Sequence, residues 1–173
     1  MITSPSDYLI GTTKIPNAIS RNAGEPENLD LLDIIERSER GLLLSLLGAS
    51  QYSMLFDELQ KLPFNIGSLE SAAVEWVDFV NGKDDWIGAK QLCKNYVYCK
   101  YIRFIEVSVT TTGAGKSKVK NFTVTDYNQK YVERWNELTI WINQDLYKFI
   151  DATDGIEIHD HYPMYQYENQ LGF

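Results

Sequence analysis

The chain has 173 residues, enough for one domain with a real hydrophobic core and too few for two domains of ordinary size. Hydrophobic residues make up 44% and charged residues 23%, as in globular proteins, while aromatic residues are frequent at 13% and favour either an aromatic core or subunit contacts. The formal net charge of −8 argues against a protein whose main task is to grip nucleic acid, because phosphate binding needs clustered Lys and Arg.

The chain begins with a segment that has no regular period. Residues 1–27 are rich in Ser, Thr, Asn, Pro and Gly, and we expect an extended N-terminal arm. These residues lack a basic stretch followed by an apolar run, and no segment of the sequence reaches the length of a membrane span. Neither a cleaved secretion signal nor a membrane-embedded protein is therefore expected.

Two helices are predicted next, separated by a glycine. The first runs from a cap at Asn28 to a stop at Gly48, with acidic residues in its opening turns, where the helix dipole favours them. Its apolar ends flank a charged middle, Glu36 to Arg40, which is expected to face solvent or a partner. Ser50 caps the second helix, and Pro63 prevents its continuation.

Two further helices follow along the chain. The first is amphipathic, begins at Ser68 and ends at Gly82, with apolar residues at helical spacing. From about Asp85 the next run is apolar nearly all the way round, which predicts a central helix contacted on most sides. Its β-branched and aromatic end, Phe104 to Thr112, is compatible with either a helix or a strand.

The remaining elements are a loop, a long helix and a tail. Residues 107–124 are rich in Thr and Gly and predict a loop or a hairpin arm. A long helix capped by Thr125 or Asp126 follows, and its apolar stripe advances in steps of three and four: Tyr131, Trp135, Leu138, Ile142, Leu146 and Phe149. Residues 151–173 have scattered aromatics without helical spacing and predict an extended tail.

These elements together predict a mainly α protein. We expect a small helical bundle over residues 28–150, with an extended loop or hairpin arm and with extended N- and C-terminal arms. No internal repeat and no heptad run long enough for a coiled coil is present.

One motif resembles the end of a phosphate-binding loop, Gly113-Ala114-Gly115-Lys116-Ser117. The full pattern requires a glycine where Thr110 stands, and polar alternation rather than a helix follows. A flexible basic loop is the favoured interpretation.

Two histidines, His159 and His161, share one face if their segment is a strand, with Asp154 and Glu157 as possible oxygen ligands. They are the only two histidines, and they lie in the predicted tail. A solvated, titratable tail is therefore favoured over a metal site.

Covalent chemistry has two candidates in the sequence, Cys93 and Cys99. They lie six residues apart, roughly 240° around a helix axis, so they cannot bond to each other, and no histidine is near them in sequence. Two buried, reduced thiols are expected. No acid/base pair stands out either, and we expect neither an enzyme, nor a cofactor, nor a metal.

The order of the segments resembles the small head-tail connector (adaptor or ring) proteins of Bacteroidetes and crAss-like bacteriophages. The resemblance covers roughly residues 15–150 and depends on order and spacing rather than on one diagnostic motif. It is carried by Leu32 to Arg40 running into Leu46-Leu47-Gly48, Tyr52 with Leu55 to Leu59, Val80 to Lys83, Trp86-Ile87-Gly88, Tyr96-Val97-Tyr98, the Thr-Thr-Gly loop at 111–113, and Tyr131 to Ile150 with Trp135-Asn136-Glu137.

The resemblance implies a structural virion protein at the head-tail interface, made in the cytoplasm of the host bacterium. Its copies would form a ring, a dodecamer, below the portal protein, extend the DNA channel and dock the next tail or ring protein. Genome DNA would pass through the channel without sequence-specific binding, and an acidic lining would keep its phosphates from sticking.

Charge and aromatic content suggest which residues make these contacts. Three lysines and no acid lie between residues 107 and 124, whereas residues 151–173 carry five acids and no Lys or Arg. Apolar side chains of the tail are plausible anchors on a neighbouring subunit. The predicted interface residues are Lys116, Lys118, Lys120, Tyr162, Met164, Tyr165, Tyr167 and Phe173.

Two other classes of protein stay open. A soluble regulatory or binding module outside the virion would remain monomeric. A small nucleotide-binding enzyme using residues 113–117 would show magnesium-dependent binding that Lys116→Ala abolishes.

Overall fold

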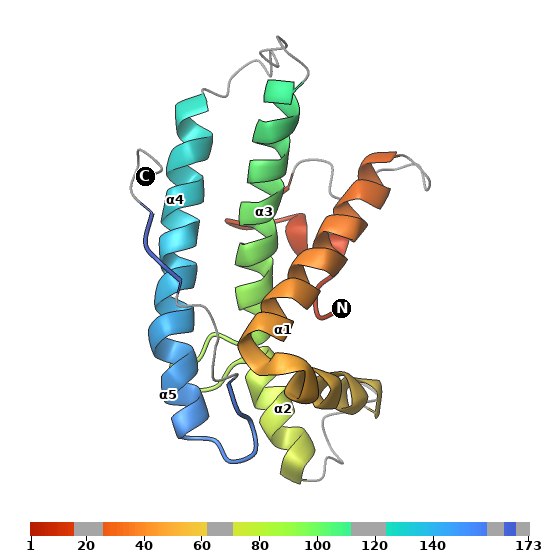
Figure 1. The fold of residues 1–173 in the computed structure, drawn as a ribbon, viewed down its shortest axis with the longest axis vertical. Coiled ribbons are helices and arrows are strands. Elements are labelled where there is room, and N and C mark those ends of the chain that lie inside the picture. The colour runs from red at the N-terminus through yellow and green to blue at the C-terminus, as the bar shows by residue number, and fades with distance from the viewer. Residues whose placement is uncertain (16–25, 62–70, 112–123, 159–164, 169–173) are drawn as a thin grey trace.

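The computed structural model is mainly α, as predicted, and its described residues form four helices packed together without a β-strand (Figure 1). The structure describes residues 1–15, 26–61, 71–111, 124–158 and 165–168. The helices are α1 (Pro26–Lys61), α2 (Ser71–Asn81), α3 (Ala89–Thr111) and α4 (Val124–Ile140), and α4 continues through a π-helical turn (Trp141–Asp145) into α5 (Leu146–Asp151).

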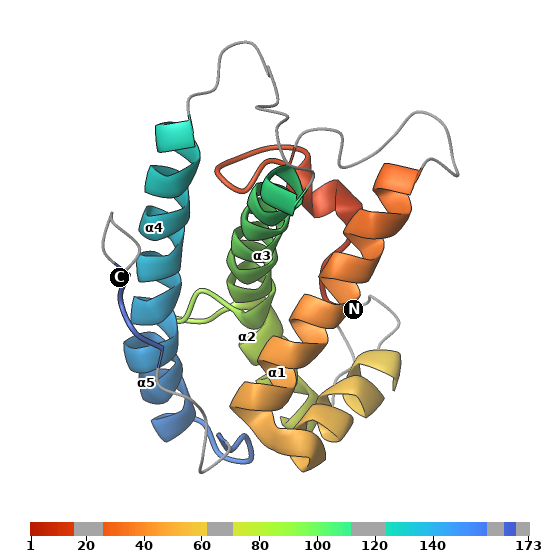
Figure 2. The ribbon, with the colours of Figure 1, turned by 45° about the horizontal axis from the view of Figure 1, so that its top comes forward.

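Helix α1 consists of two helices joined at a sharp bend. Gly48 has φ 72° and ψ 172°, a left-handed φ that glycine adopts without the steric cost of a side chain. Figures 1 and 2 show the two halves running in different directions from this point. The predicted interruption at Gly48 is confirmed.

Helix α3 is the centre of the bundle. It packs against α1, α2 and α4, and both views place it between α1 and α4 (Figures 1 and 2). The prediction of a central helix is confirmed. The strand alternative is wrong for residues 104–111, because the backbone stays helical through Thr111. The prediction of a loop at 107–124 is wrong at 107–111, which belong to α3, and at Val124, where α4 begins, and residues 112–123 lie outside the described residues.

The connection between α2 and α3 is a tight turn that inserts a tryptophan into the core. Lys83 and Trp86 form an isolated antiparallel bridge, and the Trp86 indole donates a hydrogen bond of 2.8 Å to the Phe79 carbonyl. Gly82 has φ +95°, and a Cβ there would lie 2.6 Å from the Trp86 carbonyl oxygen. Only glycine therefore fits this turn without strain.

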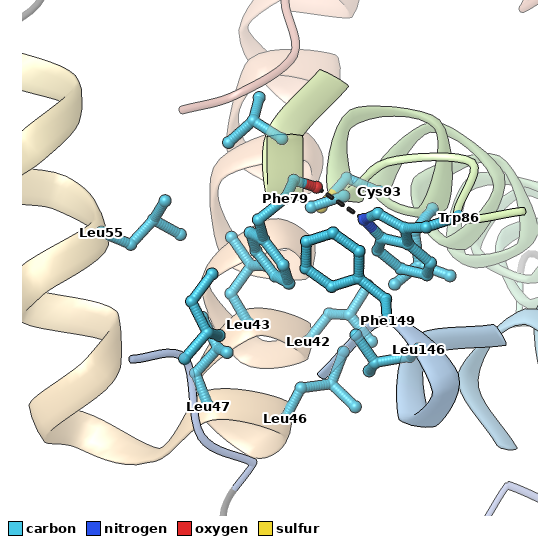
Figure 3. Close-up of a cluster of buried hydrophobic side chains, with 14 of the residues drawn as sticks. Leu42, Leu43, Leu46, Leu47, Leu55, Phe79, Trp86, Cys93, Leu146 and Phe149 are labelled. Atoms are coloured by element: carbon cyan, nitrogen blue, oxygen red, sulfur yellow. Dashed lines mark hydrogen bonds between the residues drawn. The ribbon is translucent and has the colours of Figure 1, made fainter. Parts of the chain in front are cut away.

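The core contains two clusters of buried side chains. The larger one joins α1, on both sides of the bend at Gly48, to α2, the start of α3 and the end of the α4–α5 helix. Figure 3 shows Phe79, Trp86 and Phe149 against a group of leucines in this cluster. The other cluster joins the first turns of α1, the middle of α3 and the start of α4 to Tyr8 and Ile15 of the N-terminal segment. Trp135 packs against both clusters.

The long C-terminal helix follows its predicted stripe through a π-helical turn. Leu138, Ile142 and Leu146 are all 0% exposed, although two successive steps of four residues exceed the 3.6-residue period of an α-helix. The turn at Trp141–Asp145 has more residues per turn, so all three side chains stay on one face.

The N-terminal segment is not a free arm. Pro5–Tyr8 form a 3-10 helix, opened by the Asp7 carboxylate, which accepts a 2.9 Å hydrogen bond from the Ser4 N–H. Tyr8 and Ile15 are buried at 0% and 2% exposure against the chain's own helices. Residues 1–15 therefore belong to the bundle, whereas residues 16–25 of the predicted arm lie outside the described residues.

Candidate assembly interface

Two of the predicted interface residues can be placed. Lys116, Lys118, Lys120, Tyr162, Met164 and Phe173 lie outside the described residues. Tyr167 is 57% exposed and presents an apolar ring to the outside. Tyr165 lies instead against the chain's own α4, with its ring centroid 5.7 Å from that of Trp135. Of the two, Tyr167 alone is placed to contact another molecule.

The segment 165–168 lies along α4, and helix side chains bind its backbone (Figures 1 and 2). Asn136 makes two hydrogen bonds to Glu168: its Nδ2 donates to the carbonyl oxygen at 3.0 Å, and its Oδ1 accepts from the N–H at 2.9 Å. The Trp135 indole donates to the Gln166 carbonyl at 2.9 Å, and Asn143 Nδ2 donates to the Tyr165 carbonyl at 2.7 Å. Four hydrogen bonds from three side chains of the α4–π-turn helix thus fix this segment.

The Glu168 side chain is held by groups from two helices. Arg103 of α3 contacts its carboxylate at 2.8 and 3.1 Å, and the Tyr131 hydroxyl of α4 donates to it at 2.9 Å. The Arg103 guanidinium also lies over the Tyr131 ring, 4.6 Å from its centroid. Burial raises the pKa of Tyr131, and its hydrogen bond to the carboxylate raises that pKa further.

The N-terminus is bound by one buried carboxylate of α1. Glu39 is 2% exposed and accepts hydrogen bonds from the Ile2 N–H at 2.9 Å, from the Thr3 N–H at 2.8 Å and from the Thr3 hydroxyl. Because the Thr3 hydroxyl donates its single hydrogen to Glu39, the Tyr8 hydroxyl, 3.0 Å away, donates to Thr3. Burial raises the pKa of Tyr8.

The prediction that Glu36 to Arg40 all face solvent or a partner is therefore wrong at Glu39. Glu36, Arg37 and Arg40 are exposed, as predicted. Glu39 is buried instead, and the N-terminal backbone supplies the hydrogen bonds that a buried carboxylate requires.

The cysteines were predicted to be buried and reduced, and this is confirmed. Cys93 is 0% and Cys99 is 1% exposed, and both are free thiols. Burial raises the pKa of both thiols, that of Cys99 to about 12. Neither side chain is prepared to act as a nucleophile at neutral pH, because the reactive form is the thiolate.

The other motifs fall mostly outside the described residues. Residues 112–123 include the Gly-rich loop, and residues 159–164 include both histidines. Among the described residues, no three His, Cys, Asp or Glu side chains gather closely enough to hold a metal ion. None of the described helices combines the length and apolar character needed to cross a bilayer.

Several large apolar side chains on the described surface are exposed. They come from different elements, and they include the most exposed one, Ile10 at 79%, as well as Met54, Val74, Ile140 and Tyr147 at 38–47%. Together with Tyr167 they are candidates for contacts with another molecule. No family model, curated protein or solved structure matches the chain.

Proposed function

We propose that the chain is a structural virion protein, a subunit of a ring in the phage head-tail connector. The ring lies below the portal protein, extends the DNA channel and docks the next tail or ring protein. Genome DNA passes through without sequence-specific contacts. The chain itself performs no catalysis in this role.

The observation that carries this proposal is the order and spacing of helices over residues 15–150. That order resembles the connector proteins, and the resemblance implies a helical bundle. The mainly α architecture supports the proposal, because a strand-rich or mixed fold would have excluded it. The net charge of −8 also supports it, since a channel wall that repels phosphates lets DNA slide.

Mass spectrometry of purified particles tests the proposal. The particles come from the phage or prophage whose genome carries this gene. The chain should be present at a copy number close to that of the portal protein, and twelve copies are expected. Intact, tailed particles that lack the chain would refute the proposal.

A charge-reversal variant tests the predicted portal contact separately. Lys116→Glu, Lys118→Glu and Lys120→Glu together should reduce incorporation into particles without changing the fold of the purified chain. Arg37→Glu combined with Lys148→Glu, on exposed parts of α1 and α5, is the control for surface charge. Normal incorporation of the triple variant would show that these three lysines do not contribute to the contact with the portal.

A binding module outside the virion is the second candidate, and one observation favours it. Side chains of α4 and of the π-helical turn hold a non-helical segment through its backbone, which is how many modules bind peptides. A module of this kind would stay monomeric and would be absent from the particles. The same mass-spectrometric measurement therefore separates the two functions.

A further inference from the structure

The helix side chains that hold residues 165–168 form a recognition site for a peptide backbone. Asn136 pairs with both the N–H and the carbonyl of one residue, as a neighbouring β-strand would. Trp135 and Asn143 bind two further carbonyls. These contacts fix the position and direction of the bound segment but are indifferent to its side chains.

Two of the four positions select a side chain. Tyr165 is partly buried with its ring against Trp135, whose indole also donates to the Gln166 carbonyl, so an aromatic residue is favoured there. Glu168 is held by Arg103 and Tyr131 at 2.8–3.1 Å, so a carboxylate is favoured at that position. The side chains of Gln166 and Tyr167 are exposed. The site therefore selects the pattern aromatic-X-X-Glu.

We infer that this site also binds residues 165–168 of a second copy of the chain. Every copy carries the Tyr and the Glu that the site selects. The contacts are all non-covalent, so binding within one copy and binding between two copies differ only in the effective concentration of the segment. Seven residue steps separate Ile158 from Tyr165, a reach of about 24 Å when extended. A neighbour within that distance can receive the segment.

Two complementary variants of the full chain test the exchange. The acceptor carries Tyr165→Ala and Glu168→Ala, which remove the selected side chains and leave the site intact. The donor carries Arg103→Ala and Asn136→Ala, which disable its site and leave its segment intact. The acceptor's own segment keeps only its backbone hydrogen bonds. A donor segment that carries both selected side chains therefore competes with a weakened occupant.

A labelled peptide of residues 163–170 replaces the donor in a second arm of the test. Fluorescence anisotropy should show binding to the acceptor with a Kd on the order of 100 µM, and at least about tenfold weaker binding to the wild type, whose own segment fills the site. A peptide with Glu168→Gln, and an acceptor that also carries Asn136→Ala, should each bind about tenfold more weakly. A peptide with Tyr167→Ala should bind normally.

The full-length mixture should form a 1:1 complex in sedimentation velocity that neither variant forms alone. The inference would be refuted if a helical acceptor bound neither the donor nor the peptide at roughly ten times the expected Kd. It would also be refuted if Asn136→Ala in the acceptor left the binding unchanged. If the acceptor with both substitutions does not show the spectrum of a helical protein, the single variant Glu168→Gln replaces it as the acceptor. No phage component is present in these mixtures, so the result stands apart from the particle analysis that tests the proposed function.

Discussion

Replacing Glu39 by alanine should release the N-terminal segment from the bundle. The carboxylate is 2% exposed and accepts three hydrogen bonds from Ile2 and Thr3. A hydrogen bond to a charged group contributes about 1.5–3 kcal/mol, so three give an upper bound of roughly 4.5–9 kcal/mol. The cost of burying the carboxylate lowers that figure. In the variant the N-terminal segment can also leave the bundle, so that water hydrogen-bonds to the Ile2 and Thr3 groups that Glu39 no longer binds. We expect a loss of about 3 kcal/mol in the free energy of unfolding.

Urea denaturation followed by far-UV circular dichroism measures this loss. Glu36→Ala is the matched control, because Glu36 is exposed on the same helix, and its change should stay within about 0.5 kcal/mol. Glu39→Gln keeps the shape and one acceptor oxygen, so it should cost less, about 1–2 kcal/mol. A loss below about 1 kcal/mol for Glu39→Ala would refute the conclusion that this carboxylate binds the N-terminus.

Three further predictions concern a turn, the thiols and a carboxylate. Gly82→Ala should destabilise the chain by at least about 2 kcal/mol in the same urea assay. Gly41→Ala should stabilise it by about 0.5–1 kcal/mol, because Gly41 lies in a helix and a new Cβ there would have nothing within 4 Å. Equal effects of the two substitutions would contradict this prediction. A thiol reagent at neutral pH should label Cys93 and Cys99 only after unfolding, and rapid labelling of the native chain would contradict their burial. Burial raises the pKa of the Asp7 carboxyl, but hydrogen bonds to the carboxylate outweigh this effect and lower the pKa overall. The contribution of Asp7 to stability is therefore present above the ordinary pKa of 3.8 and is lost as the pH falls through the lower pKa of the folded state. Asp7→Asn should remove this part of the acid sensitivity, and an unchanged dependence of stability on pH below 3.8 would contradict the prediction.

The helices could be predicted from the sequence because their causes are local. Apolar residues at steps of three and four recur through the segments that form α2 and the α4–α5 helix. Gly48 interrupts the helical pattern of α1. The π-helical turn at Trp141–Asp145 was not predicted. It follows from packing, since two successive steps of four residues are compatible with an ordinary helix until the core requires all three side chains on one face.

The terminal segments could not be predicted, because their structure depends on distant partners. Residues 1–15 and 165–168 have no period of their own, and both were expected to belong to extended arms. Their backbones are instead bound by side chains 22 to 37 residues away in sequence, on α1 and on the α4–π-turn helix. The sequence does not indicate whether a polar side chain on a helix surface makes its hydrogen bonds to water or to the backbone of another segment.

One signal for the N-terminal contact was nevertheless present in the first helix. Leu31, Ile35, Leu42 and Leu46 are buried, and Glu39 continues their spacing with steps of four, four, three and four. A carboxylate at a core position of an apolar stripe is costly unless hydrogen-bond donors meet it there. The spacing thus indicates a buried Glu39 that needs donors, and no basic residue on this stripe can supply them. Backbone N–H groups of a segment that belongs to no helix are the natural donors, because helical N–H groups are already engaged within their own helix.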